Sequence, residues 1–166
     1  MTKTATMPAE LLHIQQEIDI NAPVAIAFEV LLEQLGPASE MPNGEPMPMK
    51  LEPWPGGRWY RDLGKNSGHL WGHVQVIKPP TLLEVCGPLF MSYAAVNHVQ
   101  YRLIEQGAGT KLSLLHRAMG EISPEHRDRM PEGWEYILKK IREAAESKGQ
   151  RLPKPLRSLV ARDRQF

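Results

Sequence analysis

The chain has 166 residues, of which 42% are hydrophobic and 23% are charged, and this composition suits one domain with a single buried core. The formal net charge of +1 argues against a nucleic-acid-binding surface over the whole domain, because such surfaces carry a clustered basic excess. The only cysteine, Cys86, cannot form a disulfide within the chain, and no run of about 18 apolar residues occurs. We therefore expect a cytoplasmic protein with neither an export signal nor a membrane span.

The charge is unevenly distributed along the chain. Residues 148–166 contain six Lys or Arg and one Asp, which leaves the rest with 14 basic and 18 acidic residues. The sequence therefore predicts a mobile N-terminal tail over 1–8, one domain over 9–148 and a basic C-terminal tail over 149–166. The basic tail either is solvated, attracts an anionic surface or an acidic partner, or lies across the neighbouring subunit of a homodimer.

The first part of the chain predicts a strand, a helix and a loop. Apolar and polar residues alternate over 11–20, which is typical of a half-buried strand. Apolar residues at helical spacing over 24–35 predict a helix, which Asn21 can cap and Gly36 ends. Residues 37–48 are rich in Pro, Met and Gly and are predicted to form a loop.

The second part of the chain predicts an antiparallel meander followed by a long helix. Strand-like segments separated by Gly and Pro turns occupy 49–54, 57–63, 69–77, 82–86, 96–105 and 111–119. The last element begins near Ser123-Pro124, and its apolar residues at helical spacing are Trp134, Ile137, Leu138, Ile141 and Ala145. Because Pro131 removes a backbone donor, the main helix is expected over 132–147, with Gly149 as its stop.

Four short motifs occur in order along the chain: EPWPGGRW at 52–59, GHVQVIKPP at 72–80, GTKLSLLH at 109–116, and Gly133-Trp134 in the final helix. Together with the order of elements, they resemble the START-like (SRPBCC) superfamily, and most closely the branch named after the heat-shock-ATPase activator homologues. The resemblance covers roughly residues 12–147. It implies an α+β helix-grip (START/Bet v-like) fold, in which a curved antiparallel sheet of six to seven strands wraps a long C-terminal helix.

The resemblance implies three classes of function, because the superfamily includes lipid and hormone carriers, polyketide cyclases and chaperone activators. The leading hypothesis is a domain that binds a small hydrophobic molecule in a cavity between sheet and helix. The second is a cyclase, dehydratase or hydrolase with His116 or Tyr101 as the proton-transfer group and Arg58 or Glu52 nearby. The third is a partner module that stimulates a chaperone ATPase.

Candidate ligand contacts come from the large aromatic residues and from the inward positions of the last strands and the helix. The predicted set is Trp54, Trp59, Trp71, Tyr101, His116, Trp134 and Leu138. For His116 a hydrogen-bonded core histidine is the commoner explanation, and plain packing is the commoner explanation for each tryptophan taken alone. The loop over 37–48 stands where most members of the branch have a helix with a tryptophan-rich segment. Its methionines Met41, Met47 and Met49 either form an adaptable lip of the cavity or belong to a mobile surface loop.

The segment 69–77 has two orientations that alternation alone leaves open. In the favoured one, the alternate positions from Leu70 to Val76 face inward, and Trp71 lies on the outer surface, where an oligomer contact would cover it. In the other, Trp71 and His73 point into the cavity and orient a ligand.

We predict no metal site and no cofactor. His69 and His73 are the nearest pair of histidines, but on a strand they lie about 13 Å apart, too far to share one Zn²⁺. A G-x-S-x-G motif and a phosphate-binding loop are both missing, and Cys86 lies in an apolar strand without an evident base. The catalytic residues of the second hypothesis therefore stay unassigned.

Overall fold

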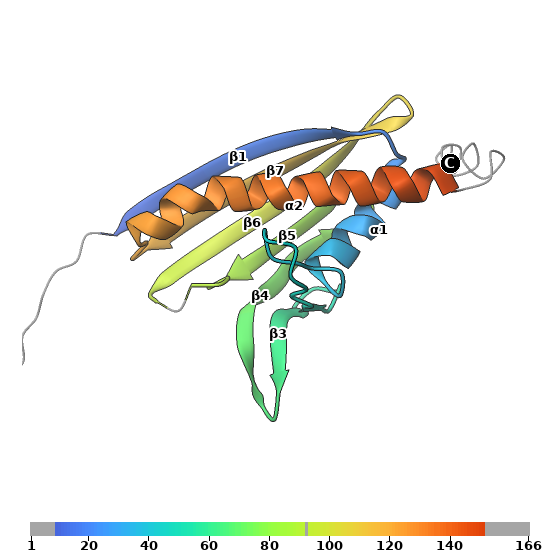
Figure 1. The fold of residues 1–166 in the computed structure, drawn as a ribbon. Coiled ribbons are helices and arrows are strands. Elements are labelled where there is room, and N and C mark those ends of the chain that lie inside the picture. The colour runs from blue at the N-terminus through green and yellow to red at the C-terminus, as the bar shows by residue number, and fades with distance from the viewer. Residues whose placement is uncertain (1–8, 92, 152–166) are drawn as a thin grey trace, which may run out of the picture.

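The computed structural model describes residues 9–91 and 93–151. Its elements are β1 (Glu10–Ile20), α1 (Val24–Leu35), β2 (Lys50–Leu51), β3 (Arg58–Gly64), β4 (Ser67–Lys78), β5 (Leu82–Gly87), β6 (Ala95–Gln106), β7 (Gly109–Gly120) and α2 (Pro124–Arg151). The strands form one antiparallel sheet in the order β1-β7-β6-β5-β4-β3-β2. The sheet curves around α2, and α1 packs beside the C-terminal half of that helix (Figure 1). The predicted helix-grip fold is confirmed.

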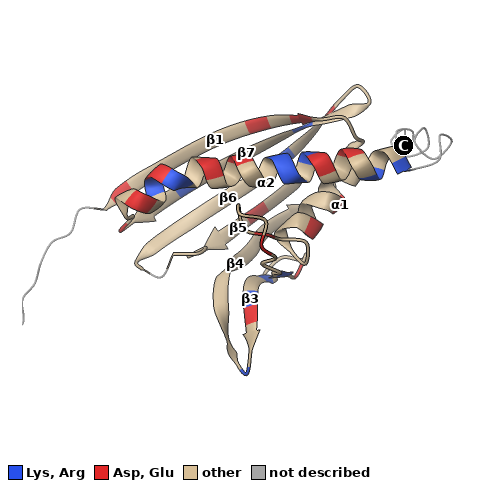
Figure 2. Cartoon of the chain, in the orientation of Figure 1, with Lys and Arg blue, Asp and Glu red and all other residues tan. Residues whose placement is uncertain are grey.

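The core lies between the concave face of the sheet and the two helices. Residues that pair across β5, β6 and β7 form buried rows. One central row consists of Val85, Val99 and His116, and the next consists of Leu83, Tyr101 and Leu114. These are the inward positions that alternation predicts for β6 and β7. Burying a large apolar side chain of this kind stabilises the fold by roughly 1.5–3 kcal/mol. Charged residues are distributed along the opposite, outer side of α2 (Figure 2).

α1 spans the residues predicted for it, but it begins without a side-chain cap. Its N-cap residue is Pro23, and no side chain accepts a hydrogen bond from the first turn. The backbone N of Asn21 instead donates to Oε1 of Glu146 in α2 at 2.9 Å. The prediction that Asn21 caps α1 is therefore wrong, and this residue fastens the entry of α1 to α2.

α2 begins at Pro124, near the predicted start of the last element, and runs as one helix through both residues that were predicted to interrupt or end it, Pro131 and Gly149. Pro131 lies inside the helix, which continues through it. The neighbours Met130 and Trp134 are both buried in the core, and Gln16 of β1 donates to the carbonyl oxygen of Pro131 at 2.8 Å. Packing on both sides of the proline therefore outweighs the local cost of one missing backbone hydrogen bond.

Gly149 does not end α2 either. It is buried within the helix, beside Ala22, and the helix extends to Arg151, the last described residue. The predicted boundary after residue 148 thus falls inside α2, while residues 1–8 and 152–166 of the two predicted tails lie outside the described residues. Within the described residues no helix combines the length and apolar character needed to cross a membrane.

The segment predicted as a strand over 49–54 is mostly a turn. Only Lys50–Leu51 pairs with β3, after which the chain folds back on itself. Gly56 has a φ of +83°, and a Cβ at Gly57 would lie only 2.0 Å from the carbonyl oxygen of Glu52. Because only glycine fits this reversal, the EPWPGGRW motif forms a tight loop rather than a longer strand.

Candidate functional site

An apolar pocket of about 420 Å³ lies between the Pro- and Met-rich loop over 37–48 and the first half of α2. Its apolar lining comes from four parts of the chain and includes Met41, Met47, Trp71, Phe90, Trp134 and Ile137. Polar side chains at its border are Glu40, His126, Arg129 and Tyr136. The pocket is therefore an opening at the edge of the sheet–helix interface.

Trp71 reaches this pocket because of a β-bulge. Trp59 pairs with Gly72, and Tyr60 pairs with Leu70, so that Trp71 is the extra residue of β4 opposite β3. A bulge redirects the side chain of the unpaired residue, and the ring of Trp71 meets the buried ring of Trp59 edge-on at 5.0 Å. Gly72 and Val74 are buried as favoured, but Leu70, which the same orientation placed inward, is 44% exposed. Trp71, however, is turned into the pocket rather than toward an outer contact.

Trp59 supports the pocket without lining it. Its side chain is 2% exposed, and its Nε1 donates to the carbonyl oxygen of Leu35 at 2.7 Å, at the end of α1. A buried indole with a satisfied N–H is a rigid packing element. Trp59 thus holds Trp71 from behind. Trp54, by contrast, is 54% exposed in the 52–57 turn and lies outside the pocket.

The side wall of the pocket is an aromatic cluster that the sequence did not reveal. Phe90 meets Trp71 at 5.8 Å and His126 at 5.4 Å, both edge-on. The ring of His126 stacks on Tyr93 at 5.6 Å, and its Nδ1 lies 2.7 Å from the Tyr93 hydroxyl. Phe90 and Tyr93 belong to the β5–β6 connection and His126 to the first turn of α2. No periodic pattern relates these residues, so only the fold brings them together.

A buried hydrogen-bonded chain connects the pocket wall with that same connection. Nε1 of Trp134 donates to Nδ1 of His116 at 3.0 Å, and Nε2 of His116 lies 2.8 Å from Oδ1 of Asn97. Because an indole N–H can only donate, Nδ1 must accept and Nε2 must carry the proton. Asn97 then donates from Nδ2 to the carbonyl oxygens of Gly87 and Pro88, each at 3.2 Å.

His116 is consequently a neutral core residue. It is fully buried, and both of its ring nitrogens are engaged by protein groups. Burial, together with the smaller effect of the nearby His98, lowers the pKa of His116 to about 4. As placed, His116 offers no free nitrogen to a substrate, so its geometry is that of the hydrogen-bonded core histidine.

Tyr101 lies next to this chain, behind Trp134. The two rings meet edge-on at 6.3 Å, and Tyr101 is fully buried. Burial raises the pKa of its phenol. Its hydroxyl has no hydrogen-bond partner among the described residues. Tyr101 does not line the pocket itself, since Trp134 stands between them.

The border of the pocket holds the 37–48 loop against α2. Glu40 accepts a hydrogen bond from the Tyr136 hydroxyl at 2.5 Å and pairs with Nζ of Lys140 at 2.7 Å. The Lys140 and Tyr136 hydrogen bonds lower the pKa of Glu40, which keeps the carboxylate ionised. These contacts position Met41 and Met47 over the pocket, whereas Met49 is buried in the core.

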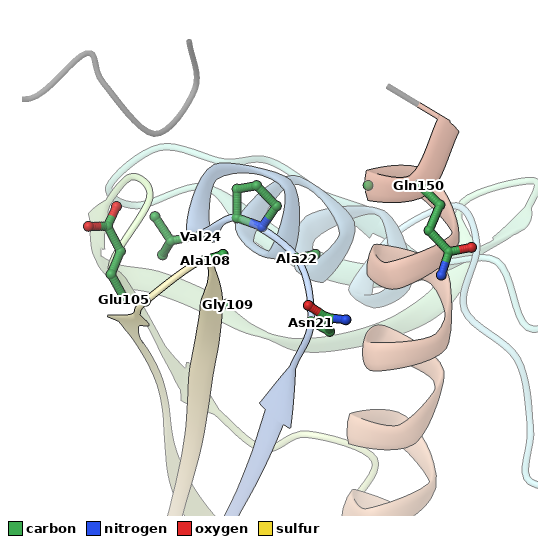
Figure 3. A pocket seen from close by; sticks show the side chains of 10 residues that line it. Asn21, Ala22, Val24, Glu105, Ala108, Gly109 and Gln150 are labelled. Atoms are coloured by element: carbon green, nitrogen blue, oxygen red, sulfur yellow. The ribbon is translucent and has the colours of Figure 1, made fainter. Parts of the chain in front are cut away.

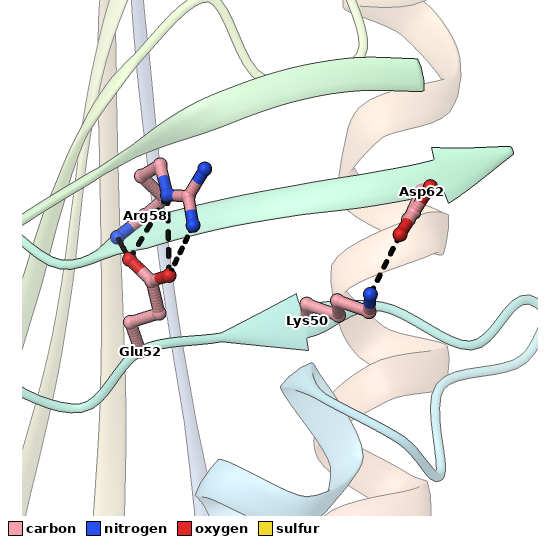
Figure 4. A network of polar contacts seen from close by, with 4 residues as sticks. All are labelled: Lys50, Glu52, Arg58 and Asp62. Atoms are coloured by element: carbon pink, nitrogen blue, oxygen red, sulfur yellow. Dashed lines mark hydrogen bonds and ion pairs between the residues drawn. The ribbon is translucent and has the colours of Figure 1, made fainter. Parts of the chain in front are cut away.

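Arg58 and Glu52 form a separate polar network on β2 and β3 (Figure 4). The guanidinium and the backbone N of Arg58 both donate to the Glu52 carboxylate, the latter at 2.8 Å, and these bonds lower the pKa of Glu52 to about 2. A neighbouring pair joins Lys50 to Asp62 at 2.6 Å. Neither Arg58 nor Glu52 lines the pocket. The acid–base groups of the second hypothesis are thus not gathered at one place.

Leu138 and two further depressions lie away from the apolar pocket. Leu138 is buried, and it borders a groove between β1 and α2 instead of the apolar pocket. A smaller pocket of about 280 Å³ lies at the opposite end of the fold, where Asn21 and Ala22 face Gly109 and Gln150 (Figure 3). Among the described residues no three His, Cys, Asp or Glu side chains cluster in a way that could hold a metal ion.

Of the predicted ligand contacts, the fold places Trp71 and Trp134 on the pocket wall. Trp59, Tyr101 and His116 form a buried layer that touches these two rings from behind.

Comparison with known proteins identifies relatives by family and by fold. The family model described as Activator of Hsp90 ATPase homolog 1-like protein matches residues 42–146, from the 37–48 loop to near the end of α2. Among curated proteins no sequence matches this chain significantly.

Several solved structures share the fold. An uncharacterized protein from Rhizobium leguminosarum has a TM-score of 0.62 at 15% identity, covering 85% of this chain and 99% of its own. CalU16 from Micromonospora echinospora has a TM-score of 0.55 at 19% identity, covering 93% and 97%. DynU16, a protein of the dynemicin biosynthetic locus, has a TM-score of 0.59 at 12% identity over 82% of this chain, which spans 48% of DynU16. At these identities the likeness concerns the fold alone.

Proposed function

We propose, from the premise that this chain belongs to the Activator of Hsp90 ATPase homolog 1-like family, that it binds a small hydrophobic molecule in the pocket between the 37–48 loop and α2. The domain is START-like, and proteins that share such a fold carry unrelated activities. Its function therefore depends on the residues of the site. The observation that carries the proposal is the pocket itself. Its volume of about 420 Å³ lies within the range of small-molecule sites.

The walls of the pocket combine rigid and adaptable parts. Trp71 is backed by Trp59, and Trp134 is held by its hydrogen bond to His116, so both aromatic surfaces have a defined position in the unliganded protein. Met41 and Met47 lie on the opposite side. Thioether side chains conform to different shapes, so this side can adjust to the ligand.

Filling the pocket tests the proposal. The probe is 1-anilinonaphthalene-8-sulfonate, and its binding is measured by the change in its fluorescence as it is titrated with the protein. Ile137 lines the pocket and is partly buried, whereas Ile104 is 51% exposed on β6 and lies outside it. We expect Ile137→Trp to weaken probe binding roughly tenfold or more, because the larger side chain occupies ligand volume. Ile104→Trp is the matched control and should bind like the wild type.

Two outcomes would overturn the proposal. Either the probe binds the wild type no better than an unrelated folded protein, or Ile137→Trp binds it as well as Ile104→Trp does. Far-UV circular dichroism of both variants excludes unfolding as the cause of a change. Native mass spectrometry of the purified wild type, followed by denaturing extraction, then identifies any co-purified molecule of a few hundred daltons.

Turnover of the bound molecule is a second candidate function, favoured by the pair formed by His126 and Tyr93. An imidazole whose Nδ1 is 2.7 Å from a phenol hydroxyl lies at the pocket border. Proton transfer requires such a group within reach of the substrate. If native mass spectrometry yields a substrate, His126→Gln should slow its conversion on the order of a hundredfold, while His69→Gln, on the exposed end of β4, should not. Equal rates for the two variants would remove this candidate.

The family name raises a third candidate, stimulation of the Hsp90 ATPase. Addition of this chain to Hsp90 in an ATPase assay tests it directly. We rank it below ligand binding because the pocket is observed in this structure, whereas the partner is inferred from the family name alone.

A further inference from the structure

The hydroxyl of Tyr101 is a buried polar atom that the fold leaves without a partner. Tyr101 is fully buried in the centre of β6, and no described residue accepts its hydrogen bond. Buried hydroxyls in folded proteins nearly always have a partner, because leaving one unsatisfied is costly. The cross-strand neighbours of Tyr101 are Leu83 and Leu114, which cannot supply an acceptor.

A second unpartnered atom lies in the same row of the sheet. Leu114 pairs with Tyr101 on one side and with Gln16 on the other. Gln16 donates from Nε2 to the carbonyl oxygen of Pro131, but its Oε1 has no partner. These two are the only buried side-chain oxygen or nitrogen atoms without a partner among the residues that the structure describes. Both lie beneath the same turn of α2.

That turn of α2 separates Tyr101 from the apolar pocket by a single side chain. Trp134 contacts the Tyr101 ring edge-on at 6.3 Å and also lines the pocket. Displacement of this indole, with loss of its hydrogen bond to His116, would therefore remove the side chain that lies between Tyr101 and the pocket. His116, the hydrogen-bond acceptor of Trp134, determines the closed position.

We propose that Tyr101 is the polar subsite of the pocket, donating a hydrogen bond to a carbonyl or hydroxyl oxygen of the bound molecule, with Trp134 as the gate. The inference rests on the proposed ligand binding and defines the ligand further: a mainly apolar body with one oxygen acceptor at the end that enters first.

The test compares two probes of nearly equal shape, 2-naphthol and 2-methylnaphthalene, by isothermal titration calorimetry. The variant is Tyr101→Phe, which removes only the hydroxyl. The control is Tyr60→Phe, the same deletion at a half-buried tyrosine of β3 outside the pocket. We expect the wild type and Tyr60→Phe to bind 2-naphthol about fivefold more tightly than 2-methylnaphthalene, as one hydrogen bond allows. Tyr101→Phe should lose this preference and keep its affinity for 2-methylnaphthalene.

The outcomes separate the two proposals. If the wild type binds both probes equally, or if Tyr101→Phe keeps the preference, the subsite is wrong while the pocket stands. If neither probe binds, both proposals fail. A second measurement needs no ligand: because the hydroxyl is unpartnered, the melting temperature of Tyr101→Phe should equal or exceed that of the wild type. A fall of more than about 2 °C would show that the hydroxyl already has an acceptor, such as a buried water, and would contradict the proposal.

Discussion

Trp134 donates a hydrogen bond from its indole Nε1 to Nδ1 of His116 at 3.0 Å, and this bond joins the middle of α2 to the centre of the sheet. Both residues are buried, so the bond is shielded from water. Since Asn97 continues the chain to the β5–β6 connection, which carries Phe90, one buried network holds two walls of the pocket. Buried polar networks of this kind favour one arrangement over alternatives when every member is satisfied.

Removing the imidazole should therefore destabilise the protein strongly. His116→Ala leaves the Trp134 N–H and the Asn97 carbonyl oxygen without partners and opens a cavity. We expect the free energy of unfolding to fall by about 3 kcal/mol, which lowers the melting temperature by roughly 10 °C. His69→Ala, at an exposed position of β4, is the control and should change stability by no more than about 0.5 kcal/mol. Differential scanning calorimetry measures both, and equal melting temperatures would contradict the proposed role of the network.

The same histidine should make stability depend on pH in a defined window. Burial holds its pKa at about 4 in the folded protein, against 6.5 for an unperturbed histidine. Because the unfolded chain takes up the proton first, the free energy of unfolding falls as the pH is lowered from about 6.5 toward 4. The contribution of neutral His116 to the free energy of unfolding is fully present above about pH 6.5. Between pH 7.5 and 5.0 the expected loss is about 2 kcal/mol.

Urea denaturation at pH 7.5, 6.0 and 5.0 checks this window. The carboxylates with lowered pKa values, Glu40, Glu52 and Asp62, add their own loss mainly below pH 4.5, so the interval above it isolates the histidine. The variant His116→Gln has no titrating group at this position and should lose most of the slope. If the variant kept the slope of the wild type, another group would be responsible.

Regular alternation predicted the inward positions of β6 and β7 correctly, because no bulge interrupts their pairing. The same rule was insufficient at Trp71. There the bulge depends on the register between β3 and β4, which is not encoded in β4 alone. The pocket also depends on His126 and Phe90, whose contacts arise only when the β5–β6 connection reaches α2. Local patterns thus predicted the scaffold, whereas the pocket walls required tertiary structure.

The Glu52–Arg58 contact should protect the turn of the EPWPGGRW motif. The backbone N of Arg58 donates to the Glu52 carboxylate at 2.8 Å. In Glu52→Ala that amide loses its acceptor, and its hydrogen exchange should accelerate at least about tenfold, as local opening becomes easier. Asp62→Ala removes the neighbouring ion pair with Lys50 and the acceptor of the Gly64 backbone N, but it leaves the Glu52–Arg58 contact in place and is the matched control. The measurement is the hydrogen-exchange rate of the Arg58 amide, followed by NMR in both variants. An unchanged rate in Glu52→Ala would mean that the carboxylate does not hold the turn.

Pro131 provides a test of how tertiary packing overrides a local rule. Proline inside a helix costs about 3 kcal/mol, because it removes one backbone hydrogen bond and crowds the preceding turn. Alanine restores the donor but makes the unfolded chain more flexible by about 1 kcal/mol. We therefore expect Pro131→Ala to raise the free energy of unfolding by about 2 kcal/mol, measured by urea denaturation at pH 7.5.

The control for that experiment is the other proline of α2. Pro124 is the first residue of the helix, and Ser123 precedes it with its Oγ accepting from the backbone N of His126 at 3.3 Å. At this first position a proline removes no helical hydrogen bond, so Pro124→Ala should leave stability unchanged or slightly lower it. If Pro131→Ala were instead destabilising, the proline would contribute to the contact of α2 with Gln16 and the sheet. The proline ring itself would then be part of how the helix fits over the core.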